Sequence, residues 1–158
     1  MTQDKETIGT ILVPHDGTEM SDKALKKAEL LARASGSQII VIHVIDDRFI
    51  SSSDAVRFIK DKTSLENAKV QLIKSLIEGA ESMLKNKIDY FNDRNTPITS
   101  ILTVGSPADQ ILQTAKEKNV GLIIIGSRRF EGNEKGKMLG SVARKVSELS
   151  SCSVLIVH

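Results

Sequence analysis

The segment with the clearest capacity for chemistry is a loop rich in glycine and basic residues, Gly126–Ser141, which reads GSRRFEGNEKGKMLGS. It follows the apolar run Gly121–Ile125, whose composition is typical of a buried strand, and its final Gly-Ser pair opens a segment with helical periodicity. Backbone amides at the N-terminus of a helix attract anions, and so do nearby Arg and Lys side chains. The loop therefore predicts a phosphate-binding site.

Two common phosphate-binding patterns do not fit this loop. A dinucleotide fingerprint needs G-x-G-x-x-G after the first strand, where this chain has Pro14–Gly17. A P-loop needs four residues between its glycines and a hydroxyl after its lysine. Here only three residues lie between the glycines of Gly132–Gly136, and Met138 stands where the hydroxyl should be. We expect a phosphate loop of another kind.

Strand-like and helix-like segments alternate along the chain and must position this loop. Strands are expected at residues 10–13, 39–45, 97–104, 121–125 and 154–157, and helices at 19–34, 65–88, 106 to about 115, and 141–149. Residues 46–63 are polar and predict a loop or a frayed helix start. Because a helix separates every two successive strands, right-handed crossovers place helices on both faces of a doubly wound parallel sheet. We expect an α/β fold of three layers, with a single domain over residues 1–158.

Composition narrows the class of protein. The chain has 158 residues, 40% of them hydrophobic, and a net charge of only +2, which argues against disorder and against a strongly electrostatic nucleic-acid binder. Cys152 is the only cysteine, so an intrachain disulfide is impossible. The polar start of the chain lacks the apolar core of a signal peptide, and no apolar run approaches the ~18–20 residues of a membrane span. We expect a cytoplasmic protein without a membrane or nucleic-acid partner.

The sheet itself indicates where a ligand would bind. Open parallel sheets bind ligands beyond the carboxyl ends of their strands, at the point where the strand order reverses. In the usual winding the first and fourth strands are neighbours there, so Pro14–Thr18 faces the glycine-rich loop across one crevice. Asp16 can accept hydrogen bonds from ribose hydroxyls. Gly126, Gly140 and Ser141 can donate backbone amides to phosphate.

Several motifs, taken in chain order, resemble the universal stress protein family of the adenine nucleotide alpha-hydrolase-like superfamily. They are Ile11–Thr18, His43–Asp46, Gly105–Pro107, Gly126–Arg128 and Leu139–Val142. The resemblance covers nearly the whole chain. It implies a five-stranded parallel sheet in the order 3-2-1-4-5 and usually a homodimer. It also implies a crevice in which many members carry ATP or AMP and others carry no nucleotide.

The resemblance assigns roles to single residues. The nucleotide-binding members carry G-x2-G-x9-G-[ST] in this loop, and the chain matches at Gly126 and at Gly140-Ser141. It departs at Arg129, which replaces the second glycine, and its span to Gly140 is one residue longer. By this resemblance Asp16 would meet the ribose, Pro14 and Val44 would flank the adenine, and Gly126, Gly140, Ser141 and Val142 would hold phosphates. The candidate nucleotide-binding residues are Pro14, His15, Asp16, Val44, Gly126, Ser127, Arg128, Arg129, Gly140, Ser141 and Val142.

Three functions are compatible with these residues. The first is a regulatory domain that binds ATP or AMP, with Mg²⁺ as an optional companion, and has little or no catalysis, because no convincing general base faces the phosphate loop. The second is a nucleotide-free dimeric interaction protein, or scaffold, of the same fold. The third is a nucleotidyl transferase, because His15–Thr18 is similar to H-x-G-H, although the second histidine is absent.

The last expected strand bears on assembly. Val154–Val157 is apolar and would lie at an edge of the sheet, where an uncovered strand promotes aggregation. Pairing with a second copy of the chain around a two-fold axis would cover it. We therefore expect a homodimer through this strand, as the family resemblance also implies.

Overall fold

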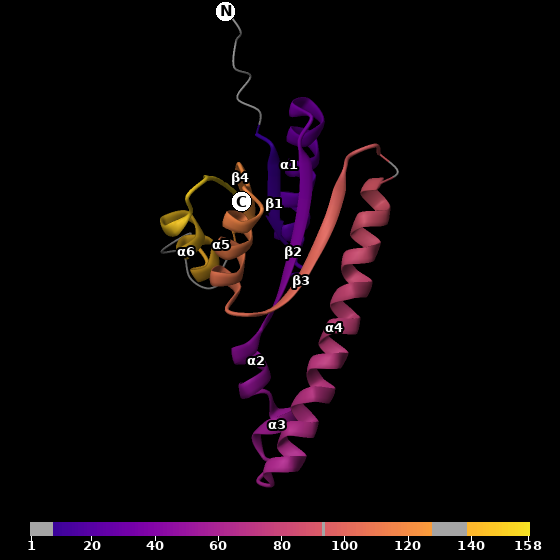
Figure 1. The fold of residues 1–158 in the computed structure, drawn as a ribbon, viewed down its shortest axis with the longest axis vertical. Helices are drawn as coiled ribbons and strands as arrows, with labels where there is room; N and C mark the ends of the chain where they lie inside the picture. The colour runs from indigo at the N-terminus through magenta and orange to yellow at the C-terminus, as the bar shows by residue number, and fades with distance from the viewer. Residues whose placement is uncertain (1–7, 93, 128–138) are drawn as a thin grey trace, which may run out of the picture.

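The described part of the chain is built on one parallel sheet (Figure 1). The computed structural model describes residues 8–92, 94–127 and 139–158. Its strands are β1 (Thr10–Pro14), β2 (Gln38–Asp46), β3 (Ile98–Gly105), β4 (Leu122–Gly126) and β5 (Ser153–Val157). They pair in the order β3-β2-β1-β4-β5, and every pairing is parallel. The predicted fold class and strand order are confirmed.

Helices cover both faces of the sheet, as the alternation of helices and strands predicted. The four that pack on it are α1 (Glu19–Ser35), α4 (Lys62–Asn92), α5 (Pro107–Glu117) and α6 (Ser141–Leu149). Successive strand residues point to opposite faces. Ile11 and Val13 accordingly pack into the core with α1 and α4, whereas Leu12 packs into a second core with α5 and α6. None of the helices in the described ranges is long and apolar enough to cross a bilayer.

The segment after β2 is more ordered than its polar composition suggested. It forms two short helices, α2 (Asp47–Ser52) and α3 (Asp54–Arg57), before α4 begins. Asp46 is the N-cap of α2, where its carboxylate accepts a hydrogen bond from the Arg48 backbone amide at 3.0 Å. Asp61 likewise accepts from the Ser64 amide at 2.8 Å at the start of α4. Side-chain caps supply partners for the first amides of a helix, which explains why polar residues start these helices.

The winding of the chain places a crevice at the carboxyl ends of the central strands. β1 leads into α1 on one face of the sheet, whereas β4 is followed along the chain by α6 on the other face. β1 and β4 are neighbours in the sheet. The strand order therefore reverses between them, at the position where open α/β sheets bind their ligands.

Candidate functional site

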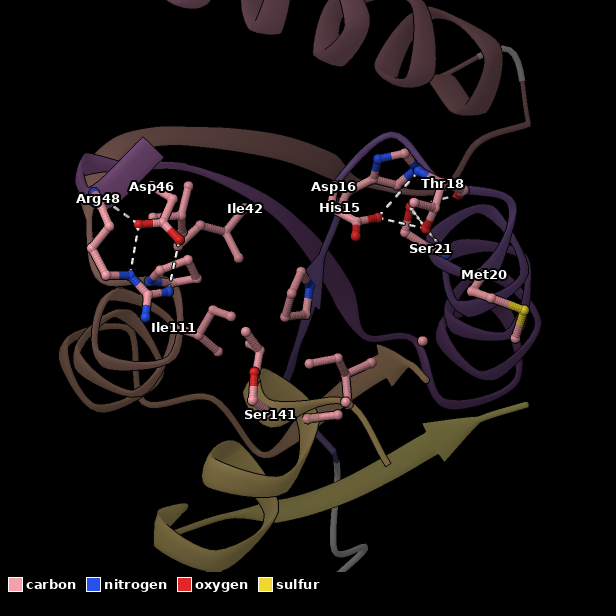
Figure 2. A pocket seen from close by; sticks show the side chains of 18 residues that line it. His15, Asp16, Thr18, Met20, Ser21, Ile42, Asp46, Arg48, Ile111 and Ser141 are labelled. Carbon is pink, nitrogen blue, oxygen red and sulfur yellow. Dashed lines mark hydrogen bonds and ion pairs between the residues drawn. The ribbon is translucent and has the colours of Figure 1, made fainter. Parts of the chain in front are cut away.

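A cavity of about 320 Å³ lies at this crevice, between the ends of β1, β2 and β4 and the start of α6 (Figure 2). Its volume falls within the range of small-molecule sites. Of the eleven residues predicted from the sequence, eight line it: Pro14, His15, Asp16, Val44, Gly126, Gly140, Ser141 and Val142. Residues more than 90 positions apart in the chain therefore meet at one site, as the carboxyl-end rule predicted.

The other three predicted residues are placed differently. Ser127 is not among the residues that line the cavity. It is only 2% exposed, and its hydroxyl hydrogen-bonds His158 Nδ1 at 2.8 Å. The Ser127 amide also donates to the Val157 carbonyl at 2.8 Å. Ser127 thus ties the end of β4 to the end of β5. Arg128 and Arg129 lie outside the described residues.

The turn between β1 and α1 is held by its own hydrogen bonds. Asp16 Oδ1 accepts from the Thr18 amide at 3.1 Å and from the Thr18 hydroxyl at 2.6 Å. Thr18 is also the N-cap of α1 and accepts from the Ser21 amide at 3.4 Å. Gly17 supplies the φ of +84° that the turn requires. A carboxylate can accept about four hydrogen bonds, and Asp16 lines the cavity in which a ligand hydroxyl would lie.

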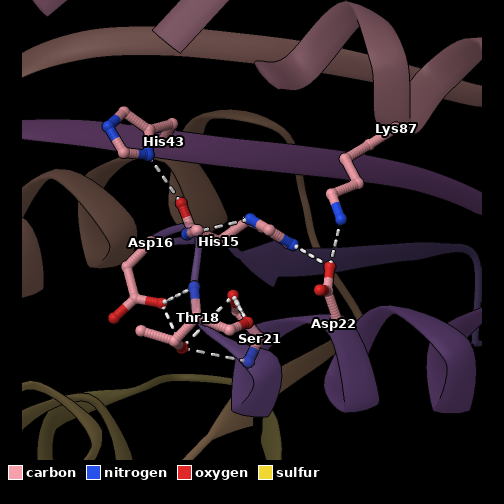
Figure 3. Close-up of polar contacts among 8 residues, drawn as sticks. His15, Asp16, Thr18, Ser21, Asp22, His43 and Lys87 are labelled. Atoms are coloured by element: carbon pink, nitrogen blue, oxygen red, sulfur yellow. Dashed lines mark hydrogen bonds and ion pairs between the residues drawn. The ribbon is translucent and has the colours of Figure 1, made fainter. Parts of the chain in front are cut away.

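His15 is among the lining residues, and its imidazole is fully buried. Figure 3 shows the ring directed toward α1, where Nε2 lies 2.9 Å from Asp22 Oδ1. The Gly17 amide donates to Nδ1 at 3.2 Å. Nδ1 is therefore the acceptor, and the proton of the neutral ring lies on Nε2. Burial lowers the pKa of His15 and outweighs the neighbouring Asp22, which acts in the opposite direction.

Asp22 links this turn to the long helix α4. Its carboxylate is bound by Lys87 as well as by His15 (Figure 3). Burial alone would raise the pKa of Asp22, but the hydrogen bonds from Lys87 and His15 outweigh it, and the pKa is lowered. Because both ring nitrogens of His15 are engaged, its imidazole is unsuited to proton or phosphoryl transfer in the cavity, which disfavours a nucleotidyl transferase.

One side of the cavity is apolar. Pro14 contributes from the end of β1, Ile42 and Val44 from β2, and Pro107 and Ile111 from α5. Ile42 and Ile111 are 1% and 2% exposed, so they form fixed walls. Such walls suit the faces of a flat heterocycle. Pro14 and Val44, to which the resemblance assigned base-flanking roles, both belong to this side.

Gly126 is required by packing. A Cβ atom at this position would lie 2.6 Å from the carbonyl oxygen of Met20 in the first turn of α1. No real side chain tolerates such a contact with backbone, so only glycine lets β4 end this close to α1. The glycine that the sequence assigned to phosphate contact lines the cavity, but the approach of α1 already explains its identity.

The N-terminus of α6 opens on the cavity. Gly140 is its N-cap and, as a glycine, supplies no side-chain cap to the helix. The first intrahelical bond runs from the Arg144 amide to the Gly140 carbonyl at 2.9 Å. Ser141, Val142 and Ala143, whose amides precede that bond and have no partner within the helix, all line the cavity. The helix thus presents backbone donors and the positive end of its dipole to any ligand bound there.

Asp46 and Arg48 were not among the predicted site residues, although both line the cavity. Arg48 donates from Nε to Asp46 Oδ1 at 3.0 Å and from Nη2 to Asp46 Oδ2 at 2.7 Å. The sequence held a signal for Asp46, because a residue that ends a parallel strand must lie at the carboxyl edge of the sheet. Arg48 gave no such signal, since its position depends on the short helix α2.

Within residues 8–92, 94–127 and 139–158, no three His, Cys, Asp or Glu side chains gather into a metal site.

An α/β fold of this strand order, with a helix N-terminus and an acidic turn facing each other at the switch point, defines a class of small-ligand-binding domain. The model of the universal stress protein family matches residues 7–158. The chain belongs to the universal stress protein family.

Known relatives resemble the chain over nearly its full length. Universal stress protein YxiE of Bacillus subtilis strain 168 is 36% identical over 148 residues, which cover 94% of this chain and 97% of that protein. The solved structure of MJ0577, a universal stress protein of Methanocaldococcus jannaschii, superimposes with a TM-score of 0.80 at 28% identity and covers 96% of each chain.

Two further solved structures are described as nucleotide complexes. A universal stress protein in complex with cAMP gives a TM-score of 0.67 at 22% identity and covers 96% of this chain and 98% of that one. A universal stress protein from Archaeoglobus fulgidus in complex with dAMP gives 0.65 at 21% identity and covers 96% and 99%. At these identities the likeness establishes the shared fold.

Proposed function

We propose that this protein is a regulatory domain that binds an adenine nucleotide, ATP or AMP, in the cavity between β1, β4 and α6, with little or no turnover. The observation that carries the proposal is the N-terminus of α6, where the N-cap Gly140 has no side chain to cap the helix and the first helical residues line the same cavity as Asp16. A backbone anion site opposite a carboxylate suits a ligand with phosphates at one end and a ribose in the middle.

Different parts of the cavity would contact different parts of the nucleotide. The amides of Ser141 and Val142 would hold a phosphate, and the helix end would stabilise the anion by ~0.3–1 kcal/mol, or up to ~2 kcal/mol where partly buried. Asp16 would accept from the ribose hydroxyls, and Pro14 and Val44 would flank the adenine. If the ligand is ATP, Mg²⁺ would bind together with it. The cAMP and dAMP complexes of two other family members support an adenine ligand.

Three predicted residues have narrower roles in this proposal. Arg128 and Arg129 would donate to the phosphates, because a guanidinium forms charge-assisted bonds to phosphate oxygens. Ser127 would hold the start of the loop in place through His158 and leave the ligand to its neighbours. In this proposal the protein acts by binding the nucleotide, and neither His15 nor Asp16 takes part in a reaction step.

Isothermal titration calorimetry with ATP, AMP, cyclic AMP and adenosine tests the proposal. We expect dissociation constants on the order of micromolar for ATP or AMP and weaker binding of adenosine, which lacks phosphate. Nucleotide released by heating the purified protein would be identified by chromatography in parallel. A protein that releases no nucleotide and shows neither heat nor a thermal shift with millimolar ATP would be the nucleotide-free scaffold instead.

The proposal includes a homodimer through β5. Of the described strands, β5 pairs only with β4, and Leu155 in this strand is 36% exposed. Pairing of two β5 strands would satisfy the open backbone edge. Light scattering should give twice the mass of one chain, and Leu155→Lys should shift the population toward monomer. A monomeric wild-type protein would contradict this part of the proposal.

A further inference from the structure

Arg48 is an exposed basic residue on the wall of a cavity that is otherwise mostly apolar or acidic on that side. It lies in the first turn of α2, immediately beyond the end of β2. Figure 2 shows it beside Asp46 and Ile111 on one side of the cavity, with Thr18, Ser21 and Met20 on the other. Arg48 therefore lies near the apolar side of the cavity and away from the turn that precedes α1. We call this apolar side, formed by Pro14, Ile42, Val44 and Ile111, the slot.

The Asp46–Arg48 pair contributes little to stability, because the side chain of Arg48 is 74% exposed and solvent screens ion pairs at such positions. Its geometry is nevertheless specific. Two side-chain hydrogen bonds, at 3.0 Å and 2.7 Å, fix the plane of the guanidinium, and Asp46 is itself held as the N-cap of α2. Arg48 also lowers the pKa of Asp46, so the pair stays ionised at neutral pH.

The other walls of the slot supply no aromatic ring. Among the cavity-lining residues in the described ranges there is no Phe, Tyr or Trp, and the imidazole of His15 is buried elsewhere. The slot walls are the aliphatic side chains of Pro14, Ile42, Val44 and Ile111. A guanidinium is planar, weakly hydrated and able to stack on an aromatic face. Within the described lining, Arg48 is the planar cation placed to do so.

We infer that Arg48 recognises the base of the bound nucleotide by stacking its guanidinium on the purine ring, and that Asp46 is a positioning residue that holds the guanidinium in plane. The inference rests on the proposed function, because it needs a purine nucleotide in this cavity. It assigns Arg48 to the base end of the ligand and separates it from the phosphate contacts at α6. The occupant it requires is a purine nucleoside, with or without phosphate.

Calorimetric titrations of Arg48→Gln, Arg48→Lys and wild type with adenosine, AMP and ATP test this assignment. Arg48→Gln should weaken all three ligands by a similar factor, about three- to tenfold, because the lost contact is to the part they share. Arg48→Lys should lose most of the same factor, because an ammonium keeps the charge but not the plane. Arg57→Lys is the matched control, since Arg57 is 68% exposed and lies on α3 beside Asp54, away from the cavity lining.

The outcomes separate the two proposals. Asp46→Asn should weaken binding less than Arg48→Gln and should add nothing to it in the double variant, as expected of a positioning residue. A loss that grows from adenosine to ATP would make Arg48 a phosphate contact and overturn the stacking assignment. Unchanged affinities in both Arg48 variants would overturn it too, while the proposed function would stand. A wild type that binds none of the ligands overturns both.

Discussion

The two walls of the cavity use their hydrogen-bonding groups in opposite ways. In the β1–α1 wall, Asp16 and Thr18 cap their own turn and helix, and both nitrogens of His15 are engaged. In the α6 wall, Gly140 provides no side-chain cap, and the first residues of the helix line the cavity. The groups of the first wall bond to one another, whereas the first amides of α6 have no partner within their helix and can donate to a ligand. A wall held by its own hydrogen bonds, opposite the N-terminus of a helix, is the basis of the proposed anion site.

The largest expected effect concerns the packing behind the first wall. Gly126→Val would place side-chain atoms against the Met20 carbonyl, which lies 2.6 Å from an ideal Cβ. We expect destabilisation of about 1–3 kcal/mol or more, because the backbone of α1 must shift. Chemical denaturation followed by circular dichroism measures it.

Gly79→Ala is the matched control for this variant. Gly79 lies inside α4 with nothing within 4 Å of an ideal Cβ, so alanine there should stabilise the protein by up to about 1 kcal/mol. Opposite signs for the two glycines would confirm that Gly126 is a packing requirement. A Gly126→Val protein as stable as wild type would show that α1 does not approach β4 this closely.

The second effect contrasts the two helix starts directly. Thr18→Ala removes the cap of α1 and should cost about 1 kcal/mol, within the usual range of ~0.5–2 kcal/mol. Ser141→Ala removes no cap from α6 and should change the free energy of unfolding by less than about 0.5 kcal/mol. Urea unfolding of both variants measures the difference. Equal costs would mean that the two walls are not built differently.

The third effect is the pH dependence of the first wall. The folded pKa of His15 is lowered from 6.5 chiefly by burial, so the unfolded chain binds a proton more readily. The stability that neutral His15 contributes is therefore complete above pH 6.5 and is lost as the pH falls below it. The charged groups facing the ring are Asp22 on α1, Lys87 on α4 and Asp16 on its own turn.

Urea midpoints of wild type and His15→Gln between about pH 5 and pH 7.5 measure this dependence. Wild type should lose stability toward the acid end more steeply than His15→Gln, because glutamine does not titrate. The comparison removes the contributions of the remaining histidines, which the two proteins share. Parallel slopes would show that His15 does not titrate differently on folding. Asp22, whose pKa is lowered from 3.8, acts only at more acid pH.

Sequence patterns predicted the architecture because the fold follows from hydrophobic periodicity. The order of strands and helices, and the meeting of Pro14 with Gly140 at one crevice, follow from alternation and the carboxyl-end rule. The orientation of individual side chains did not follow. Ser127 bonds to His158, just after the carboxyl end of β5, and nothing in its neighbours along the chain indicates that partner.

Other features depend on contacts between distant elements. The packing reason for Gly126 comes from the backbone of α1, and the partners of Asp22 come from both the β1 turn and α4. Arg48 reaches the cavity only because α2 forms where a polar loop or frayed helix start was expected. Residue types and spacing carry no record of such tertiary approaches, so these features needed the structure.

The central claim is that the open N-terminus of α6 binds the phosphates of the ligand, and Gly140→Asp tests it most directly. Gly140 has φ −58° and ψ 149°, a conformation open to any residue, and aspartate is a favoured N-cap that should stabilise the free protein by a few tenths of a kcal/mol. Its carboxylate would occupy the same amides and repel phosphate. The decisive measurement is the ATP dissociation constant of the folded Gly140→Asp variant against wild type. We expect a loss of at least about tenfold, and equal affinity in the two proteins would contradict the claim.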